Sequence, residues 1–287
     1  MKIVSKKKGN QKYFYLKHSF RKGSKVLTKE RYLGSKIPEN IEEIKNIFKK
    51  DIKLDLNKKL EAIKNNFQAE WKRIPESARK KELEEISIAF TYNTNAIEGS
   101  TITLEETREI IHDKISPNKS LRDVRETEAH SEIFIKMLNK KEEITNALLL
   151  EWHEEMFGMT KSDIAGKFRD YLVRVGPYLA PDWQEVKKMM NELIDFIKNN
   201  KKMNPVELSA RAHYQFEKVH PFGDGNGRIG RLLMNQIIWH EGYPMLIIEY
   251  KKRKSYYRAL QKGEEGFVSY FIRRYLTVHK KRCLGRL

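Results

Sequence analysis

Residues 220–231 read HPFGDGNGRIGR, and this stretch decides how the rest of the chain is interpreted. Its three alternating glycines weaken a helix and add little to a strand, so the segment is expected to be a loop. An imidazole, a carboxylate and two permanently charged guanidinium groups lie within the same twelve residues. The alternative is a glycine-rich helix connector with surface arginines. The convergence of an acid, a base and two cations favours a functional site.

Two common glycine motifs do not fit this stretch. GNGRIG at 225–230 matches the dinucleotide pattern G-x-G-x-x-G, and Glu249 lies at about the right distance downstream. That pattern must follow a buried strand, whereas Ala212, Phe216 and Val219 precede it at helical spacing. A Walker loop needs a lysine after its glycines, and none follows here. The sequence therefore predicts neither a Rossmann nor a Walker site.

A third interpretation is an anion-binding nest between two helices. Successive backbone N–H groups of a tight glycine turn converge on phosphate oxygens, and a new helix near Asn226 adds its positive dipole end. Arg228 and Arg231 are three residues apart and share a helix face that suits phosphate. Asp224 is a hard oxygen ligand suited to Mg²⁺, and His220 can accept a proton.

The remainder of the chain is expected to be mostly helical, apart from its N-terminal segment. Residues 12–34 carry β-favouring aromatic residues around a turn signal at 22–25, which predicts a β-hairpin. A lone hairpin is marginal in water, so it should pack on the helical body or on another subunit, which leaves a homodimer open. Elsewhere apolar residues follow helical spacing. Helices are expected over 120–140, 183–199 and 206–219, with a capping box of Thr103 and Glu106 opening another.

Composition limits the class of protein. Lys and Arg number 57 against 39 Asp and Glu, so the net charge is +18, which suits anionic partners. Scattered lysines are usually solvated, so a nucleic-acid-binding regulator is kept as the second hypothesis. The single Cys283 excludes an internal disulfide and a Cys-rich zinc site. The start lacks the apolar core of a secretory signal, and no run is long enough for a membrane span, so a soluble cytoplasmic protein is expected.

The residues from His220 to Arg231 resemble the Fic family. They fit every fixed position of the motif H-x-F-x-[DE]-G-N-G-R-x-x-R, and Asn235 fits its extended form. GKFR at 166–169, GYP at 242–244 and YYRAL at 256–260 resemble neighbouring family segments. The resemblance implies an enzyme that transfers AMP from ATP to a Ser, Thr or Tyr hydroxyl of a target protein. Relatives that phosphorylate carry lysine in place of Gly227, so kinase activity is not expected, while UMP or phosphocholine transfer is not excluded.

The resemblance also implies roles for individual residues. His220 would be the general base and Asp224 would hold Mg²⁺. Segment 175–178 resembles a flap that covers the nucleotide and aligns an extended target segment by strand addition. The residues implied to bind ATP are Val175, Gly176, Pro177, Tyr178, Gly225, Asn226, Gly227, Arg228, Arg231, Tyr256 and Tyr257.

TNAIEGS at 94–100 resembles the inhibitory motif [ST]-x-x-x-[ED]-[GN] of many Fic proteins. Thr94 and Glu98 are four residues apart on one helix face, and Gly99 is a helix-ending residue. The alternative is a capped helix with a solvated acid. The resemblance implies that Glu98 pairs with Arg231 and inhibits the enzyme within the chain. In some relatives the same glutamate supports removal of AMP.

The expected architecture is mainly α, a Fic-type helical bundle with a small β-hairpin flap and an N-terminal β-hairpin appendage. Residues 1–37 are assigned to the appendage, 38–80 to a helical linker region, and 81–287 to the catalytic domain with its inhibitory helix.

Overall fold

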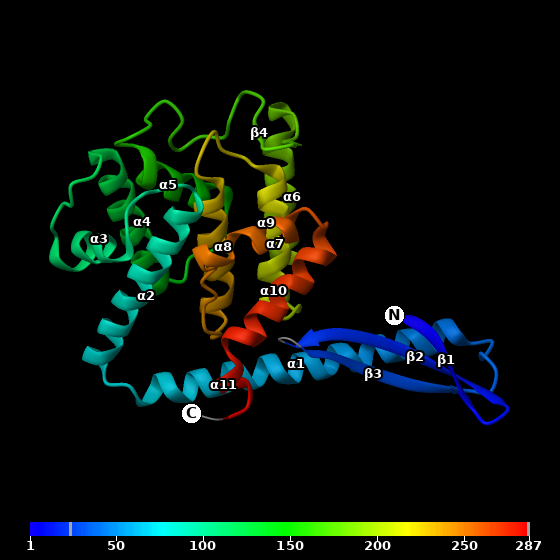
Figure 1. The fold of residues 1–287 in the computed structure, drawn as a ribbon. Coiled ribbons are helices and arrows are strands. Elements are labelled where there is room, and N and C mark those ends of the chain that lie inside the picture. Colours follow the sequence, from blue (N-terminus) through cyan, green and yellow to red (C-terminus); the bar gives the residue numbers. More distant parts are fainter. Residues whose placement is uncertain (23–24, 286–287) are drawn as a thin grey trace. The chain divides into compact units, whose positions relative to one another are not determined.

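A computed structural model describes residues 1–22 and 25–285 of the chain, which divides into two compact units. One unit comprises Met1–Asn66 and Arg273–Leu287, and the other comprises Phe67–Ile272. Helices α1 (Ile41–Arg73) and α10 (Glu264–Val278) contribute residues to both (Figure 1). The domain boundaries expected at residues 37 and 80 stay predictions.

The smaller unit contains a three-stranded antiparallel sheet in the order β1-β2-β3. Its strands are β1 (Lys2–Lys8), β2 (Gln11–Lys22) and β3 (Lys25–Gly34), and the short helix α11 (Lys280–Cys283) belongs to the same unit. Strands β2 and β3 confirm the predicted hairpin. The turn predicted at 22–25 includes positions 23–24, which lie outside the described residues. Strand β1 was not predicted, because its four lysines interrupt the alternation of apolar residues that is typical of a strand. The same lysines protect this edge strand from pairing with another chain.

The sheet of the smaller unit packs one face against α1. Leu16 of β2, Leu33 of β3 and Phe48 of α1 are buried together, with Ile41 and Ile44 beside them. The alternation of the strands puts Leu16 and Phe14 on this face and Tyr13 and Tyr15 on the other. The predicted appendage is therefore stabilised by a helix, as a small sheet requires.

The larger unit is almost entirely helical, and its N-terminal half includes α2, the helix that ends just before Glu98. Two helix starts and one helix end confirm their sequence signals. Thr103 forms a capping box with Glu106, and Ser120 accepts a hydrogen bond from Asp123 N–H. Gly99 has a positive φ of 94° just after α2 ends. The elements of this half are α2 (Glu76–Ile97), α3 (Leu104–Arg108), the π-helical turn η1 (Glu109–Asp113), α4 (Leu121–Asn139) and α5 (Asn146–Phe157).

The second half of the larger unit carries the glycine-rich loop. Helices α7 and α8 form a pair at the centre of this unit, and the loop at 220–225 joins them (Figure 1). Their apolar faces belong to one large buried core with α4, α5 and α6. The elements are β4 (Arg174–Val175), β5 (Tyr178–Leu179), α6 (Trp183–Asn199), α7 (Pro205–Val219), α8 (Asn226–His240), the 3₁₀ turn η2 (Tyr250–Lys252) and α9 (Arg253–Leu260).

Strands β4 and β5 form the small hairpin that was expected near residues 175–178. Val175 pairs with Tyr178, and Gly176, with φ of 57°, makes the turn between them. Within the described part of the chain, no helix combines the length and apolar character needed to span a membrane.

Candidate functional site

The loop between α7 and α8 is bounded by two residues with left-handed backbone conformations. His220 ends α7 with φ of 51°, and Gly225 precedes α8 with φ of 76°. A Cβ atom on Gly225 would lie 2.3 Å from Cε2 of Phe157. A residue other than glycine would therefore clash with this ring and would also strain the left-handed backbone. A non-glycine residue with positive φ is uncommon, and such residues cluster at functional sites.

Phe222 and Asn226 fix the loop from inside. Phe222 is fully buried, and its ring stacks on that of His153 with 3.9 Å between the ring centroids. The Asn226 side chain accepts a hydrogen bond from the Phe222 N–H and donates one to the Phe222 carbonyl, both at 2.8 Å. Because both ends of this amide are engaged, Asn226 offers a ligand its backbone N–H rather than its side chain.

Arg169 ties the loop to the start of the β4–β5 hairpin. Its side chain is buried, and Nε donates a hydrogen bond to the His220 carbonyl at 2.9 Å. Its two Nη atoms donate to the carbonyls of Tyr171 at 2.8 Å and Pro181 at 2.6 Å, on either side of the hairpin. One guanidinium group therefore positions both His220 and the hairpin.

His220 is suited to accept a proton. Burial lowers the pKa of its imidazole below the ordinary 6.5, although a hydrogen bond to the Glu217 carbonyl and the charge of Glu98 act in the opposite direction. A lowered pKa leaves the ring neutral at neutral pH, which is the form that can take a proton from a hydroxyl.

The first turn of α8 has the features of an anion-binding site. The first four N–H groups of a helix have no partner within it, and the N-cap Gly225 has no side chain to satisfy them. The dipole of a 15-residue helix adds positive potential at the same end. The loop thus supplies donors for phosphate oxygens beside His220.

Arg231, in the N-terminal half of α8, is held by Thr94 of α2 and by Glu98, the residue that follows this helix. Its Nη2 donates to Glu98 Oε1 at 2.6 Å and to the Thr94 carbonyl at 3.2 Å, and its Nε donates to Thr94 Oγ1 at 3.3 Å. Arg231 is 1% exposed. A Cβ atom on Gly227 would lie 2.1 Å from Glu98 Oε1, so this carboxylate lies against the helix N-terminus. The structure therefore brings together the four predicted residues Thr94, Glu98, Gly227 and Arg231.

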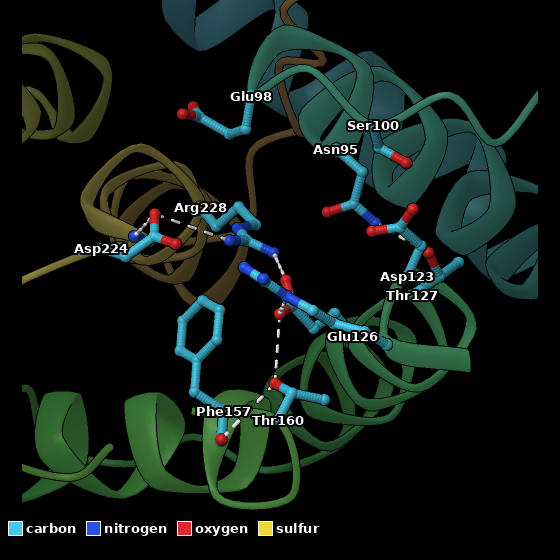
Figure 2. Close-up of polar contacts among 12 residues, drawn as sticks. Asn95, Glu98, Ser100, Asp123, Glu126, Thr127, Phe157, Thr160, Asp224 and Arg228 are labelled. Carbon is cyan, nitrogen blue, oxygen red and sulfur yellow. Dashed lines mark hydrogen bonds and ion pairs between the residues drawn. The ribbon is translucent and has the colours of Figure 1, made fainter. Parts of the chain in front are cut away.

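Glu126 of α4 organises a second cluster on the other side of the loop. Its Oε2 accepts a hydrogen bond from Arg228 Nη1 at 2.6 Å, and its Oε1 accepts one from Thr160 Oγ1 at 3.1 Å (Figure 2). Oε1 also lies 3.0 Å from Lys161 Nζ. Burial raises the pKa of Glu126, but Arg228 and Lys161 lower it by more, so the carboxylate stays charged. The ring of Phe157 lies 4.5 Å from the Arg228 guanidinium carbon.

Glu126→Ala should lower the free energy of unfolding by about 3 kcal/mol, because removal of one member of a buried ion pair leaves the Arg228 charge uncompensated. Denaturant unfolding measures the effect. Glu128→Ala is the matched control, since Glu128 lies on the same helix with its side chain 43% exposed. Its cost should stay within about 0.5 kcal/mol. Equal losses for the two variants would contradict the assignment.

Asp224 is the carboxylate of the loop that a cation could reach. Its side chain is 46% exposed, Oδ1 accepts the Gly225 N–H at 2.6 Å, and Oδ2 lies 2.6 Å from Lys161 Nζ. Burial raises the pKa of Asp224, but Lys161 and Arg228 lower it below its ordinary value. The described residues contain no group of three or more His, Cys, Asp or Glu side chains able to hold a metal. The carboxylate of Asp224 is a hard oxygen donor of the kind that Mg²⁺ prefers, so it is the residue of this loop that could hold that ion.

The tyrosines and the hairpin residues lie in different environments. Tyr256 is 1% exposed and its hydroxyl is 2.8 Å from His213 Nε2, so it is part of the core. Tyr257 is 41% exposed, and its hydroxyl donates to the Ile97 carbonyl at 3.2 Å, next to Glu98. Of the two tyrosines, Tyr257 is thus the one with a surface that a nucleoside could touch. Tyr178 anchors the hairpin by donating to the Lys218 carbonyl at 2.8 Å.

Three residues that shape the site were not among the predicted ones. Glu126 forms an i,i+4 pair with Arg122, which in sequence looks like an ordinary surface pair. Lys161 is one of many lysines in a strongly basic chain. Arg169 was part of a quoted segment but had no assigned contact. Long-range contacts define these three roles, and local sequence carries no signal for them.

The family comparison matches residues 143–238 to the Fic/DOC family. Protein adenylyltransferase Fic of Nematostella vectensis is 35% identical over 201 residues, which cover 68% of this chain and 47% of that protein. Protein adenylyltransferase fic-1 of Caenorhabditis elegans is 30% identical over 224 residues, covering 73% and 43% respectively. The chain therefore spans about half the length of the curated relatives it matches.

Solved structures confirm the expected fold class. Fic-1 from Caenorhabditis elegans is similar with a TM-score of 0.68 and 27% identity, over 84% of this chain and 73% of that one. A Fic domain containing signaling protein from Bacteroides thetaiotaomicron gives a TM-score of 0.67 at 24% identity, over 80% of this chain and 98% of that one. The second likeness concerns the fold alone.

Proposed function

We propose that this chain, which belongs to the Fic/DOC family, transfers AMP from ATP to a Ser, Thr or Tyr hydroxyl of a target protein. The observation that carries the proposal is the loop at 220–225, which joins a neutral imidazole, free helix N–H groups and Arg231 in one site. The names of its curated relatives, protein adenylyltransferases, support the same activity.

The residues divide the reaction among them. His220 takes the proton of the incoming hydroxyl, whose oxygen forms a bond to the α-phosphorus while the bond to the β-phosphate oxygen breaks and pyrophosphate leaves. The N–H groups of the first turn of α8 and the cation of Arg228 stabilise charge on the phosphates. Asp224 would hold Mg²⁺, which would supply further charge neutralisation. No covalent intermediate with the protein is needed.

Glu98 restrains this activity in the proposed cycle. Its carboxylate lies against the N-terminus of α8 and on Arg231, which is the position that a phosphate group would take. ATP that binds while Glu98 remains there has its γ-phosphate displaced. The contact therefore supports inhibition within the chain.

Incubation of the purified protein with ATP labelled on the α-phosphate, Mg²⁺ and a cell lysate tests the proposal. Labelled protein bands, identified as AMP-modified side chains by mass spectrometry, are the expected result. Label from γ-phosphate instead would indicate phosphoryl transfer. If neither label appears with wild-type or Glu98→Gly protein, the proposed activity is wrong.

Asp224→Asn should remove most of the stimulation of ATP binding by Mg²⁺. Loss of an outer partner of a metal site already lowers metal affinity about 10–100-fold, so loss of the ligand itself should cost at least about 10-fold. Calorimetric titration with ATP, with and without Mg²⁺, measures this. Asp170→Asn, an exposed acid before the hairpin, is the matched control and should behave as wild type. Full Mg²⁺ stimulation of Asp224→Asn would place the metal elsewhere.

A further inference from the structure

We propose that Lys161 is an additional cation of the nucleotide site, and that its ammonium group exchanges Asp224 for a phosphate oxygen when ATP and its metal bind. This inference rests on the proposed function, because it needs a triphosphate beside Asp224. It assigns Lys161 a nucleotide-binding role that neither the loop motif nor the helix motif includes.

The position of Lys161 is fixed at its backbone and adjustable at its tip. It follows α5, where its N–H donates to the Phe157 carbonyl at 2.7 Å, and its own carbonyl accepts the Ala165 N–H at 3.0 Å. Its side chain is 11% exposed, and its Nζ lies 2.6 Å from Asp224 Oδ2 and 3.0 Å from Glu126 Oε1. A lysine tip on a flexible stem can change acceptors without movement of the backbone.

The cluster around Lys161 carries more positive than negative charge in the absence of a ligand. Two carboxylates, Glu126 and Asp224, face three cations, which are Lys161, Arg228 and Arg122. Figure 2 shows Glu126 and Asp224 approached by Arg228. Arg228 is committed to Glu126 at 2.6 Å, whereas its Nη2 lies 3.8 Å from Asp224. Lys161 is therefore the cation that directly neutralises Asp224.

ATP and its metal change the partners of Lys161. A metal ion bound to Asp224 would compete with the ammonium group of Lys161, because both cations bind the same carboxylate. Glu126, the other acceptor of Lys161, already holds Arg228. Phosphate oxygens would then be the nearest uncompensated anions, and an ammonium group is a strong phosphate ligand. Lys161 thus compensates Asp224 before the metal binds and compensates phosphate afterwards.

The ratio of ATP dissociation constants in EDTA and in saturating Mg²⁺ measures this exchange. Lys161→Met should raise that ratio about 10-fold, within the range of about 5–150-fold typical of coupled binding sites. Without metal, the exposed charge of Asp224 would repel ATP and weaken binding strongly. With Mg²⁺, the metal would neutralise Asp224 without competition from an ammonium group, so binding would weaken less.

Two further variants make the measurement decisive. Lys167→Met removes the same charge from an exposed position on the same segment and should leave the ratio unchanged. Lys161→Gln removes the charge but keeps a hydrogen-bonding side chain, and it should raise the ratio as much as Lys161→Met does. Cooperative thermal melting of both variants shows that they are folded. A ratio equal to wild type in both Lys161 variants overturns the exchange, even if ATP binding weakens uniformly. Failure of wild-type protein to bind ATP would instead reject the proposed function, and this inference with it.

Discussion

His220→Ala should slow AMP transfer by about 10²–10⁴-fold, the usual contribution of a general base, while ATP still binds. In the proposed reaction the imidazole takes the proton of the incoming hydroxyl, whereas affinity for ATP comes from helix N–H groups and the cations of α8. Initial rates with labelled ATP and calorimetric titration separate the two effects. Transfer near the wild-type rate would reject the role of His220.

The same assignment sets the pH dependence of the wild-type enzyme. Burial lowers the pKa of His220 below 6.5, and the base must be neutral, so the rate should rise with pH through a midpoint below 6.5 and then level off. His220→Ala should lose this acid limb. His112→Ala is a suitable control because His112 is a half-exposed histidine paired with Glu84, far from the loop in sequence. It should keep both the rate and the acid limb.

The part of the site predicted from sequence is the part with local causes. Alternating glycines, a helix start at Asn226 and the spacing of Arg228 and Arg231 are short-range features, and the structure has α8 begin at Asn226. The ends of α6 and α7 likewise follow their predicted ranges because caps and apolar spacing specify them.

The part that sequence did not predict depends on contacts between distant segments. Glu126 meets Arg228 across 102 positions, and Arg169 meets His220 across 51. Charged residues on a helix are usually exposed to solvent unless they are paired, and the sequence does not reveal the distant partners of Glu126. Its burial therefore could not be predicted. Tyr256 is the opposite case. The family resemblance implied that it binds ATP, whereas its side chain is buried in the core.

Glu98→Gly should raise AMP transfer, including self-modification, by about 10²-fold. The Glu98 carboxylate lies 2.6 Å from Arg231 Nη2 and against Gly227, so it occupies the cation and the helix end expected to hold the γ-phosphate. A triphosphate displaced by about 1 Å can lose on the order of 10²-fold in rate, because the α-phosphorus is no longer in line with the hydroxyl. Initial rates of self-modification with labelled ATP measure the gain.

Two comparisons separate release of inhibition from a general loosening of the protein. Arg231→Ala added to Glu98→Gly should erase the gain, because the freed guanidinium group is then missing. Glu241→Gly makes the same change at the C-cap of α8, where the acid is 51% exposed, and should leave the rate unchanged. Glu98→Gly leaves the buried Arg231 without its carboxylate partner, which can lower the free energy of unfolding by about 3 kcal/mol. Thermal melting of each variant should therefore be measured together with the transfer rates. A folded Glu98→Gly protein that binds ATP and is no faster than wild type would show that this contact does not inhibit the enzyme.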